Sequence, residues 1–260
     1  MMTPGRLAFI TGASSGIGQA LAAHYAQQGW RLALVARRVD AIEQWARVQG
    51  LNAPRCVAYG ADVSQIDSIV AAGMRCIDQQ GLPDVVIANA GISVGMDTAI
   101  REDLDVLADT LALNNVGLAA TFHPFLAPMK ARAEGTLVGV ASVAAIRGLP
   151  GHGAYCASKA GVVAYCESLR GECLGSGVRV VTIVPGYVDT PLTAGNRYGM
   201  PFMLRADDFA ARACRAIAAG SSYRVIPWQM GVVAKLMRVL PNALFDRLLE
   251  GRGRKRRRGE

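Results

Sequence analysis

Few residues in this 260-residue sequence could build a metal site or a set of disulfide bonds. Only three histidines and six cysteines occur, and no two cysteines form a Cys-x-x-Cys pair or gather with a histidine. Structural zinc sites and disulfide frameworks depend on such spacings. We therefore expect no metal centre, and we interpret the six cysteines as reduced thiols.

Export and membrane-spanning segments are also missing from the sequence. Residues 1–12 lack the basic stretch, the long apolar segment and the small-residue cleavage site of a secretory signal. The chain has no uninterrupted run of about 18 apolar residues, which a membrane-spanning helix would need. These absences predict a cytoplasmic protein.

The positive charge of the chain is concentrated at its C-terminus. The net charge is +8, and residues 251–260 supply five of these eight charges. The rest of the chain has an ordinary charge balance, so we expect no specific nucleic-acid partner. The basic residues of this tail are Arg252, Arg254, Lys255, Arg256, Arg257 and Arg258.

Apolar runs alternate with helix-period segments through most of the sequence. Parallel strands need such crossover segments between them, and a run that is apolar throughout fits a strand covered on both faces. The pattern predicts an α/β fold with a single domain, residues 1–228, in which a Rossmann-type doubly wound parallel sheet lies between two layers of helices. Ligands bind such sheets beyond the carboxyl ends of the strands. The expected strands are Leu7–Ile10, Leu32–Ala36, Cys56–Tyr59, Val85–Ala88, Leu137–Ala141 and Val178–Val184.

A glycine-rich loop follows the first expected strand directly. Thr11–Gly18 has a strand before it and a helical run after it, and its glycines let the backbone approach a pyrophosphate at the helix N-terminus. We interpret this segment as a dinucleotide-binding loop rather than a plain turn. The residues expected to contact the cofactor are Gly12, Ser14, Ser15, Gly16, Ile17 and Gly18.

The same loop also contains the Gly-x-Ser-x-Gly pattern of a hydrolase nucleophile elbow, from Gly12 to Gly16. An elbow so near the N-terminus would have no preceding strands from which to build an oxyanion loop. No histidine further along the sequence stands in an obvious triad setting. The hydrolase interpretation is therefore disfavoured.

The end of the second expected strand bears on the choice of cofactor. An acidic residue there would bind a ribose 2′-hydroxyl and repel a 2′-phosphate. The sequence has Arg37 and Arg38 instead, and guanidinium groups bind phosphate oxygens well. NADPH or NADP+ is therefore favoured over NADH. The alternative is that both arginines are merely solvated, because arginine is abundant in this chain.

A tyrosine and a lysine stand four residues apart in a later helix-period segment. Tyr155 and Lys159 therefore share one face of the expected helix. A free phenol has a pKa of about 10, and about 4 kcal/mol of phenolate stabilisation would bring it near 7. A nearby cation shifts the pKa in this direction, so Tyr155 is a candidate acid/base for a carbonyl or an alcohol. Ser142, at the end of the preceding strand, adds a hydroxyl.

In this order and spacing, the motifs resemble the short-chain dehydrogenase/reductase family, in its single-domain branch, over about residues 5–225. An adenine-side Asp matches Asp62, and the helix Asn of the family matches Asn114, with neighbouring Asn115 as an alternative. The cofactor residues that the resemblance implies beyond the glycine loop and the two arginines are Asp62, Val63, Asn89, Ala90, Gly91, Tyr155, Lys159, Pro185, Gly186, Val188 and Thr190.

The resemblance also implies a catalytic tetrad and its partners. Ser142 would hydrogen-bond the substrate oxygen, and Tyr155 would donate or remove the proton. Lys159 would lower the tyrosine pKa and bind the nicotinamide ribose, while Asn114 would anchor a proton-relaying water chain. The expected partners are a small-molecule carbonyl or alcohol substrate and further copies of the chain. A non-catalytic NADP-binding regulator of the same fold is the alternative function.

The sequence gives less information about the substrate than about the cofactor. Residues at about 190–209 would form a lid, and its apolar side chains suggest a lipophilic substrate, because apolar pockets gain affinity by excluding water. It is equally consistent with the sequence that these side chains only pack against the sheet. The lid residues concerned are Tyr198, Met200, Phe202, Met203 and Leu204.

The C-terminus has the pattern of two short amphipathic helices in residues 229–250, separated by Pro241, followed by a disordered basic tail in residues 251–260. The helices would cover the substrate pocket or a subunit interface. Alternatively, an apolar helical face followed by a basic cluster would dock on an anionic membrane surface. Nucleic-acid binding by this tail is less favoured, since no aromatic residue is interleaved with its charges. The apolar face comprises Val232, Val233, Leu236, Met237, Leu240, Leu244, Phe245, Leu248 and Leu249.

Overall fold

A computed structural model describes residues 5–196, 198–251 and 253–260, so that Arg252 of the basic tail lies outside the described residues. Its strands are β1 (Leu7–Thr11), β2 (Arg31–Ala36), β3 (Cys56–Gly60), β4 (Val85–Ala88), β5 (Gly135–Val140), β6 (Val178–Pro185) and β7 (Tyr223–Ile226). Its helices are α1 (Gly16–Gln27), α2 (Val39–Val48), α3 (Ile66–Gln80), α4 (Asp103–Leu111), α5 (Gly117–Arg132), α6 (Gly153–Glu172), α7 (Ala206–Ala218), α8 (Trp228–Val239) and α9 (Asn242–Leu249), with a π-helical turn η1 (Ala112–Val116) and a 3-10 turn η2 (Val143–Ala145).

The described residues form one seven-stranded sheet in the order β3-β2-β1-β4-β5-β6-β7, and every pair of neighbours is parallel. The predicted doubly wound α/β sheet is confirmed, and six strands lie where the apolar runs placed them. The sequence did not reveal β7, because this edge strand has only four residues and its first two side chains are exposed.

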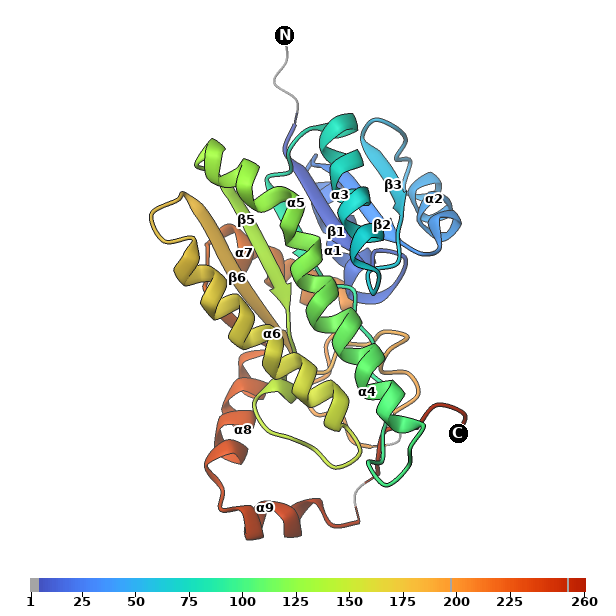
Figure 1. Ribbon diagram of the computed structural model, residues 1–260, viewed down its shortest axis with the longest axis vertical. Coiled ribbons are helices and arrows are strands. Elements are labelled where there is room, and N and C mark those ends of the chain that lie inside the picture. The colour runs from blue at the N-terminus through green and yellow to red at the C-terminus, as the bar shows by residue number, and fades with distance from the viewer. Residues whose placement is uncertain (1–4, 197, 252) are drawn as a thin grey trace.

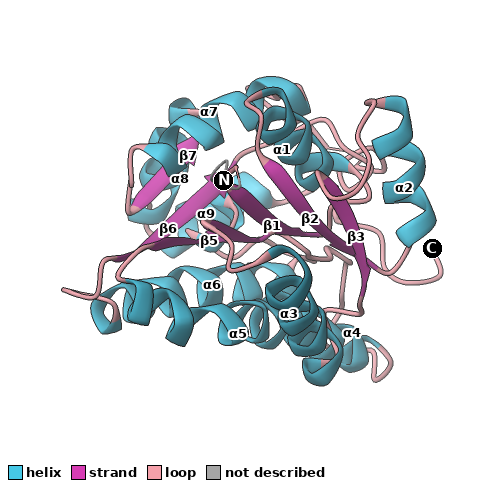
Figure 2. Cartoon of the chain, turned by 90° about the horizontal axis from the view of Figure 1, so that it is seen from above, coloured by secondary structure: helices cyan, strands magenta, loops and turns pink. Residues whose placement is uncertain are grey.

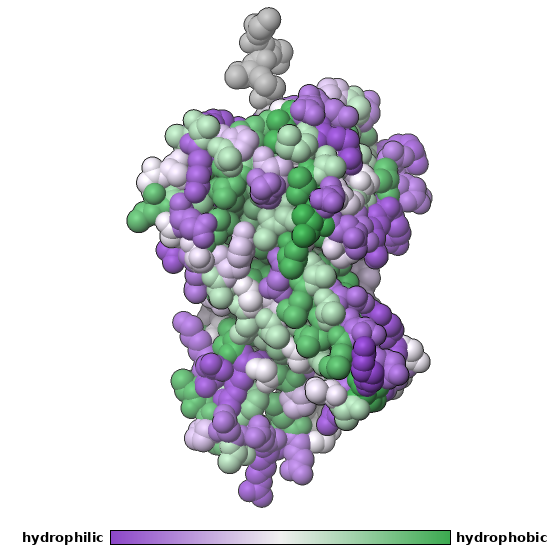
Figure 3. All heavy atoms as spheres, in the orientation of Figure 1, coloured by the Kyte–Doolittle hydropathy of each residue, from purple (hydrophilic) through white to green (hydrophobic). Residues whose placement is uncertain are grey.

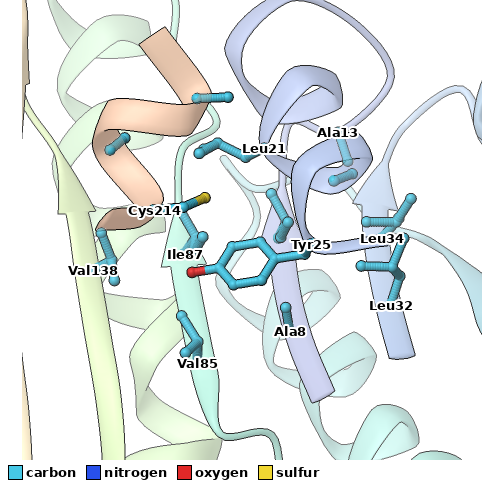
Figure 4. Packing of buried hydrophobic residues seen from close by; sticks show 14 of the residues in the cluster. Ala8, Ala13, Leu21, Tyr25, Leu32, Leu34, Val85, Ile87, Val138 and Cys214 are labelled. Atoms are coloured by element: carbon cyan, nitrogen blue, oxygen red, sulfur yellow. The ribbon is translucent and has the colours of Figure 1, made fainter. Parts of the chain in front are cut away.

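Helices cover both faces of the sheet, which gives three layers (Figure 2). Helices α1, α2 and α7 lie on one face, and α3, α4, α5 and α6 lie on the other. Each face has its own buried apolar cluster. In the cluster beneath α1 and α7, the ring of Tyr25 packs among aliphatic side chains and its hydroxyl points toward Cys214 (Figure 4).

The strand order creates the opening that a ligand needs. The chain leaves β1 toward β2 on one side and later returns to β4 on the other side, so β1 is the point where the order reverses. The crossover segments diverge there, and the carboxyl ends of β1 and β4 are left uncovered by either helix layer. The glycine loop after β1 and Asn89 after β4 therefore face each other across this opening.

The C-terminal helices extend the molecule beyond the sheet (Figure 1). They lie on either side of Pro241, as the sequence predicted, but their apolar face is divided. Val233 and Met237 line a cavity, whereas Val232 and Leu236 are exposed. Among the helices of the described residues, none combines the length and the apolar character needed to cross a membrane.

The structure differs from the sequence expectation in the basic tail. Residues 253–260 lie against the body of the domain near α4, not as a free chain (Figure 1). The physical reason is charge pairing: Arg257 and Arg258 each contact an aspartate of α4.

Candidate active site

The glycine loop is fixed to the neighbouring strand β4 by two polar side chains. Thr11 Oγ1 accepts hydrogen bonds from the backbone N–H groups of Asn89 and Ala90, both at 3.1 Å. Asn89 Nδ2 in turn donates to Thr11 O at 2.9 Å. These contacts bind the carboxyl end of β1 to that of β4. They leave the backbone of the loop as a preformed cradle.

Two glycines allow the cradle to be this tight. Gly12 has φ +67°, in the left-handed region that favours glycine. A Cβ atom on Gly18 would lie 2.3 Å from Gly12 O, so only glycine lets α1 begin so close to the loop. Gly18 is buried and does not line the cavity described next, unlike the other loop residues that were expected to contact the cofactor. Its role in the structure is close packing.

A cavity of about 600 Å³ runs from the end of β2, past the glycine loop, to the end of β5. It has backbone amides at a helix N-terminus in its middle, two arginines at one end, and a serine, a tyrosine and a lysine at the other. This donor set fits a phosphorylated dinucleotide. The predicted residues that line it are Gly12, Ser14, Ser15, Gly16, Ile17, Arg37, Arg38, Asp62, Val63, Asn89, Ala90, Gly91, Ser142, Tyr155, Lys159, Pro185, Gly186, Val188 and Thr190.

The adenine end of this cavity combines two cations with one acid. Arg37 and Arg38 follow β2 directly and are exposed. Asp62 Oδ1 accepts hydrogen bonds from the hydroxyl and the N–H of Ser64, at 2.8 and 3.0 Å. These bonds, with a smaller contribution from Arg37, lower the pKa of Asp62. The carboxylate is thus held by its own turn, and the arginines remain available at the cavity mouth.

Tyr155 and Ser142 face each other where the sheet ends. Ser142 is the N-cap residue of η2, and its hydroxyl accepts a hydrogen bond from Ala144 N at 3.2 Å. Burial raises the pKa of Tyr155 above its ordinary value of 10.0, and a hydrogen-bonding interaction with Ser142 lowers it in part. In the chain alone, the tyrosine is therefore a protonated group, which suits a proton donor.

Lys159 is one helical turn below Tyr155 and is 5% exposed. Its Nζ donates to Val140 O at 2.9 Å and lies 5.8 Å from the centroid of the Tyr155 ring. Burial lowers the pKa of Lys159 to about 8. In the chain alone, burial dominates the pKa of Tyr155, and the expected lowering of that pKa by Lys159 stays a prediction.

Asn114 lies within the π-helical turn η1 and is 1% exposed. Its Oδ1 accepts from Ile92 N at 2.9 Å, and its Nδ2 donates to Ile92 O and to Ser158 Oγ. A Cβ atom on Gly91 would lie 3.2 Å from Asn114 Oδ1 and 3.4 Å from Lys159 Nζ. Asn114 is therefore close to the lysine.

The neighbouring asparagine faces elsewhere. Asn115 Nδ2 donates to Ser158 O at 2.9 Å, and this side chain packs against Gly161 of α6. Of the two candidates from the sequence, Asn114 is the one beside Lys159. It does not line the cavity itself.

A second cavity, of about 880 Å³, meets the first one at Ser142, Tyr155 and Gly186. Its walls come from η2, from the segment after β6 and from α8. Apolar and aromatic side chains dominate them, among them Tyr187, Met230 and Met237. The cavity therefore offers a largely apolar space with the tyrosine and serine hydroxyls at its inner end.

The segment expected to form a lid is divided between cavity and core. Tyr198 and Met200 line the second cavity, and the hydroxyl of Tyr198 lies 3.3 Å from Nε2 of His152, just before Tyr155. Phe202 is 50% exposed. The far end of the predicted lid is different, because α7 begins at residue 206 and Phe209 is fully buried in the core.

The structure also bears on the two rival site types. Within the described residues, no group of three or more histidine, cysteine or acidic side chains is placed to hold a metal ion. Ser14, the serine of the Gly-x-Ser-x-Gly pattern, lines the first cavity, and none of the hydrogen bonds among described residues joins it to a histidine. The loop therefore has the surroundings of a ligand cradle and lacks those of a nucleophile elbow.

Some residues of the site carried no signal in the sequence. The hydroxyl of Thr11 acts through backbone groups of a strand far along the chain, and no spacing rule links it to Asn89. His152 enters the second cavity only because α6 begins there. Lys255 also lines this cavity, although the sequence placed it in a disordered tail.

Comparisons with known proteins show the family to which this chain belongs. Residues 6–200 match the family model of short chain dehydrogenases. A protein of Myxococcus xanthus (strain DK1622), described as an uncharacterized oxidoreductase, is 38% identical over 245 residues, which cover 93% of this chain and 95% of that protein.

Two solved structures are similar in fold. A short-chain dehydrogenase/reductase from Burkholderia phymatum in complex with NAD gives a TM-score of 0.80 at 24% identity, covering 91% of this chain and 94% of that one. An alcohol dehydrogenase from the archaeon Thermococcus sibiricus, complexed with 5-hydroxy-NADP, gives 0.72 at 28% identity, covering 85% and 95%. At 24% identity, the similarity to the Burkholderia phymatum structure supports the fold alone.

The buried Lys159 predicts an unusual pH dependence of stability. Below pH 8, Lys159 is charged in both the folded and the unfolded chain, and burial of the charge costs on the order of 3 kcal/mol. Between pH 8 and its ordinary pKa of 10.5, the unfolded chain binds more protons, so stability rises with pH. Lys159→Met removes this cost. We expect its gain in Tm over the parent chain to be largest below pH 8 and to shrink toward pH 10.

Thermal unfolding of the parent chain and the variant across this pH range measures the effect. The exposed lysine of α8 supplies the control, since Lys235→Met should shift Tm equally at each pH. A Tm difference for Lys159→Met that stays constant with pH would show that Lys159 is not desolvated in the folded chain.

Proposed function

Since the chain belongs to the short-chain dehydrogenase family, we propose that this oxidoreductase interconverts a carbonyl and an alcohol by hydride transfer, with NADP(H) as cofactor and Tyr155 as acid/base. The observation that carries the proposal is the junction of the two cavities. Ser142 and Tyr155 line both of them. A cofactor in the first cavity and a substrate in the second would therefore meet at these two hydroxyl groups.

Each side chain at this junction has a proposed task. When bound, the reduced nicotinamide would supply the hydride. Ser142 would donate a hydrogen bond to the carbonyl oxygen, and Tyr155 would donate the proton to the alkoxide that develops there. Lys159, whose ammonium is buried beside the first cavity, would bind the ribose and lower the tyrosine pKa in the loaded site. Asn114 would anchor a water chain from Lys159 toward solvent.

The preference for NADPH rests on the end of β2. Arg37 and Arg38 line the cavity there and are exposed, and the acid nearby, Asp62, is already bonded to Ser64. A 2′-phosphate would meet two guanidinium groups instead of a carboxylate. The similar solved structures include one complex with NAD and one with 5-hydroxy-NADP, so the preference depends on these two arginines alone.

A lipophilic substrate is supported by the walls of the second cavity. Tyr187, Met200, Met230 and Met237 contribute aromatic or flexible apolar surface to it. Burying such surface against an apolar ligand is favourable by about 25 cal/mol per Å². The non-catalytic regulator of the same fold has no need for a serine and a tyrosine at the inner end of this cavity, which is why we favour the enzyme.

The oligomeric state of the protein and its location in the cell stay predictions. For a homo-oligomer, the exposed apolar side chains of Leu104 and Leu111 on α4 and of Val116 in η1 are suitable. Apolar surface is also visible on the face of the molecule drawn in Figure 3. For membrane docking through the C-terminus, the exposed apolar side chains are present, but part of the basic charge is engaged elsewhere. Arg257 and Arg258 are paired with aspartates, which weakens their attraction to anionic lipids.

Removal of one hydroxyl group tests the proposed acid/base. Tyr155→Phe keeps the ring and removes the proton carrier, so we expect turnover to fall by at least about a hundredfold, while NADPH affinity changes by less than about twofold. Loss of NADPH absorbance with a panel of aldehydes, ketones, steroids and quinones measures turnover. The control is Tyr165→Phe, an exposed tyrosine of the same helix that lines neither cavity. Turnover of Tyr155→Phe within tenfold of the parent would refute the assignment.

Removal of two charges tests the choice of cofactor. Arg37→Ala combined with Arg38→Ala should weaken NADPH binding by about tenfold or more, because charge-assisted hydrogen bonds to the 2′-phosphate are lost, and should leave NADH binding nearly unchanged. Titration calorimetry measures both affinities. The double variant Arg47→Ala with Arg215→Ala removes the same charge at exposed positions outside the cavity and serves as the control. Equal losses for both cofactors would contradict the proposed recognition.

A further inference from the structure

The C-terminal residues 253–258 pass the mouth of the second cavity and are held there by their backbone. Gly95 N donates a hydrogen bond to Arg256 O at 2.8 Å, and Gly95 forms a parallel bridge with Arg257. The approach is very close, because a Cβ atom on Gly95 would lie 2.1 Å from Lys255 O. Only glycine at this position leaves room for the segment.

Two ion pairs fix the segment further along. Arg257 Nε donates to Asp103 Oδ2 at 2.6 Å, and the side chain of Asp103 is only 3% exposed. Asp103 also accepts a hydrogen bond from Asp97 N at 2.7 Å, so its carboxylate is held from two sides. Arg258 Nη2 lies 2.7 Å from Asp109 Oδ2. Without Arg257, the carboxylate of Asp103 would be buried and unpaired, which is costly.

This anchoring brings Lys255 into the wall of the second cavity. Its Nζ donates to Leu192 O at 3.0 Å and to Asn196 Oδ1 at 2.7 Å. An ammonium group has three donors, so these two bonds leave one donor unused. Both partners are neutral, and none of the ion pairs among the described residues includes Lys255. Partial burial lowers the pKa of Lys255, as expected for a cation without a counter-ion.

The charges around the cavity have one sign. Its lining contains no aspartate or glutamate among the described residues, and Arg147 is a second cation. The guanidinium of Arg147 is already engaged, because it donates to the carbonyl oxygens of Met237 and Leu240 and stacks on the ring of Phe245. Arg147 is thereby held against the C-terminal helices, whereas Lys255 directs a free donor at a cavity that is otherwise mainly apolar.

We propose that Lys255 binds the carboxylate of an amphipathic substrate, one with an apolar chain in the second cavity and a carbonyl or alcohol group at Tyr155. The proposal rests on the proposed function and adds a substrate class to it. The spare N–H of Lys255 donates to one carboxylate oxygen, and the cavity wall covers the apolar chain. The C-terminal segment thereby acts as a specificity-determining part of the pocket.

Binding of simple amphiphiles tests this proposal without any turnover. Octanoate, octan-1-ol and octyltrimethylammonium are titrated into the full-length protein by calorimetry. We expect octanoate to bind about tenfold more tightly than octan-1-ol, because it adds a charge-assisted hydrogen bond in a partly desolvated site. Octyltrimethylammonium should bind most weakly. In Lys255→Met, octanoate and octan-1-ol should bind within about twofold of each other, whereas Lys255→Arg should keep the preference.

Two further variants make the outcome decisive. Lys235→Met removes the same charge from an exposed position on α8 and should leave the preference intact. Gly95→Ala displaces the segment without altering Lys255, and it should abolish the preference as Lys255→Met does. Equal binding of octanoate and octan-1-ol to the parent chain overturns the proposal, and so does a preference that survives in Lys255→Met. Either result leaves hydride transfer at Tyr155 standing, since that is measured by NADPH oxidation.

Discussion

The first turn of α1 approaches the end of β1 so closely that no side chain fits between them, and the whole site is arranged around this contact. Gly18 lies where a Cβ atom would overlap Gly12 O, so the helix begins directly beneath the loop. Its free N–H groups and positive end therefore face the cavity that opens at the reversal of strand order. Thr11 and Asn89 keep the neighbouring strand in register with the loop. Without this close packing, the cavity would have no anion-binding centre.

The chemistry depends on how the fold distributes burial around that cavity. Tyr155 and Lys159 lie on one face of α6, and both lose solvent there. The pKa of the phenol rises, and the pKa of the ammonium falls to about 8. These shifts make both neutral forms easier to populate. Burying the charged ammonium of Lys159 therefore lowers the free energy of unfolding, and only binding partners in the cavity would offset this loss. The site is thus built at the expense of stability, as functional sites often are.

The sequence predicted those parts of the structure that depend on local pattern and missed those that depend on distant contacts. Six strands, the loop after β1 and the pair Tyr155 and Lys159 followed from apolar runs, glycine spacing and helical periodicity. Strand β7 was missed because it has only four residues at a sheet edge and its first two side chains are exposed, which gives no distinctive pattern. The basic tail, residues 251–260, was expected to be disordered, because nothing in its own sequence shows that the buried Asp103 lies beside Arg257. The same holds for Lys255, which reaches the second cavity only through that anchoring.

Hydride transfer from the first cavity to the second is most directly tested by isotope labelling. The full-length protein is incubated with NADPH that carries deuterium at both positions of C4 of the nicotinamide ring, and with aldehydes and ketones of increasing apolar length, some bearing a carboxylate. Mass spectrometry then locates the label in the product. If the cofactor and the substrate meet at Tyr155, where the two cavities join, deuterium should appear on the carbinol carbon of at least one product. NADPH that binds tightly and delivers no deuterium to any carbonyl would contradict an enzymatic role and favour a cofactor-binding regulator.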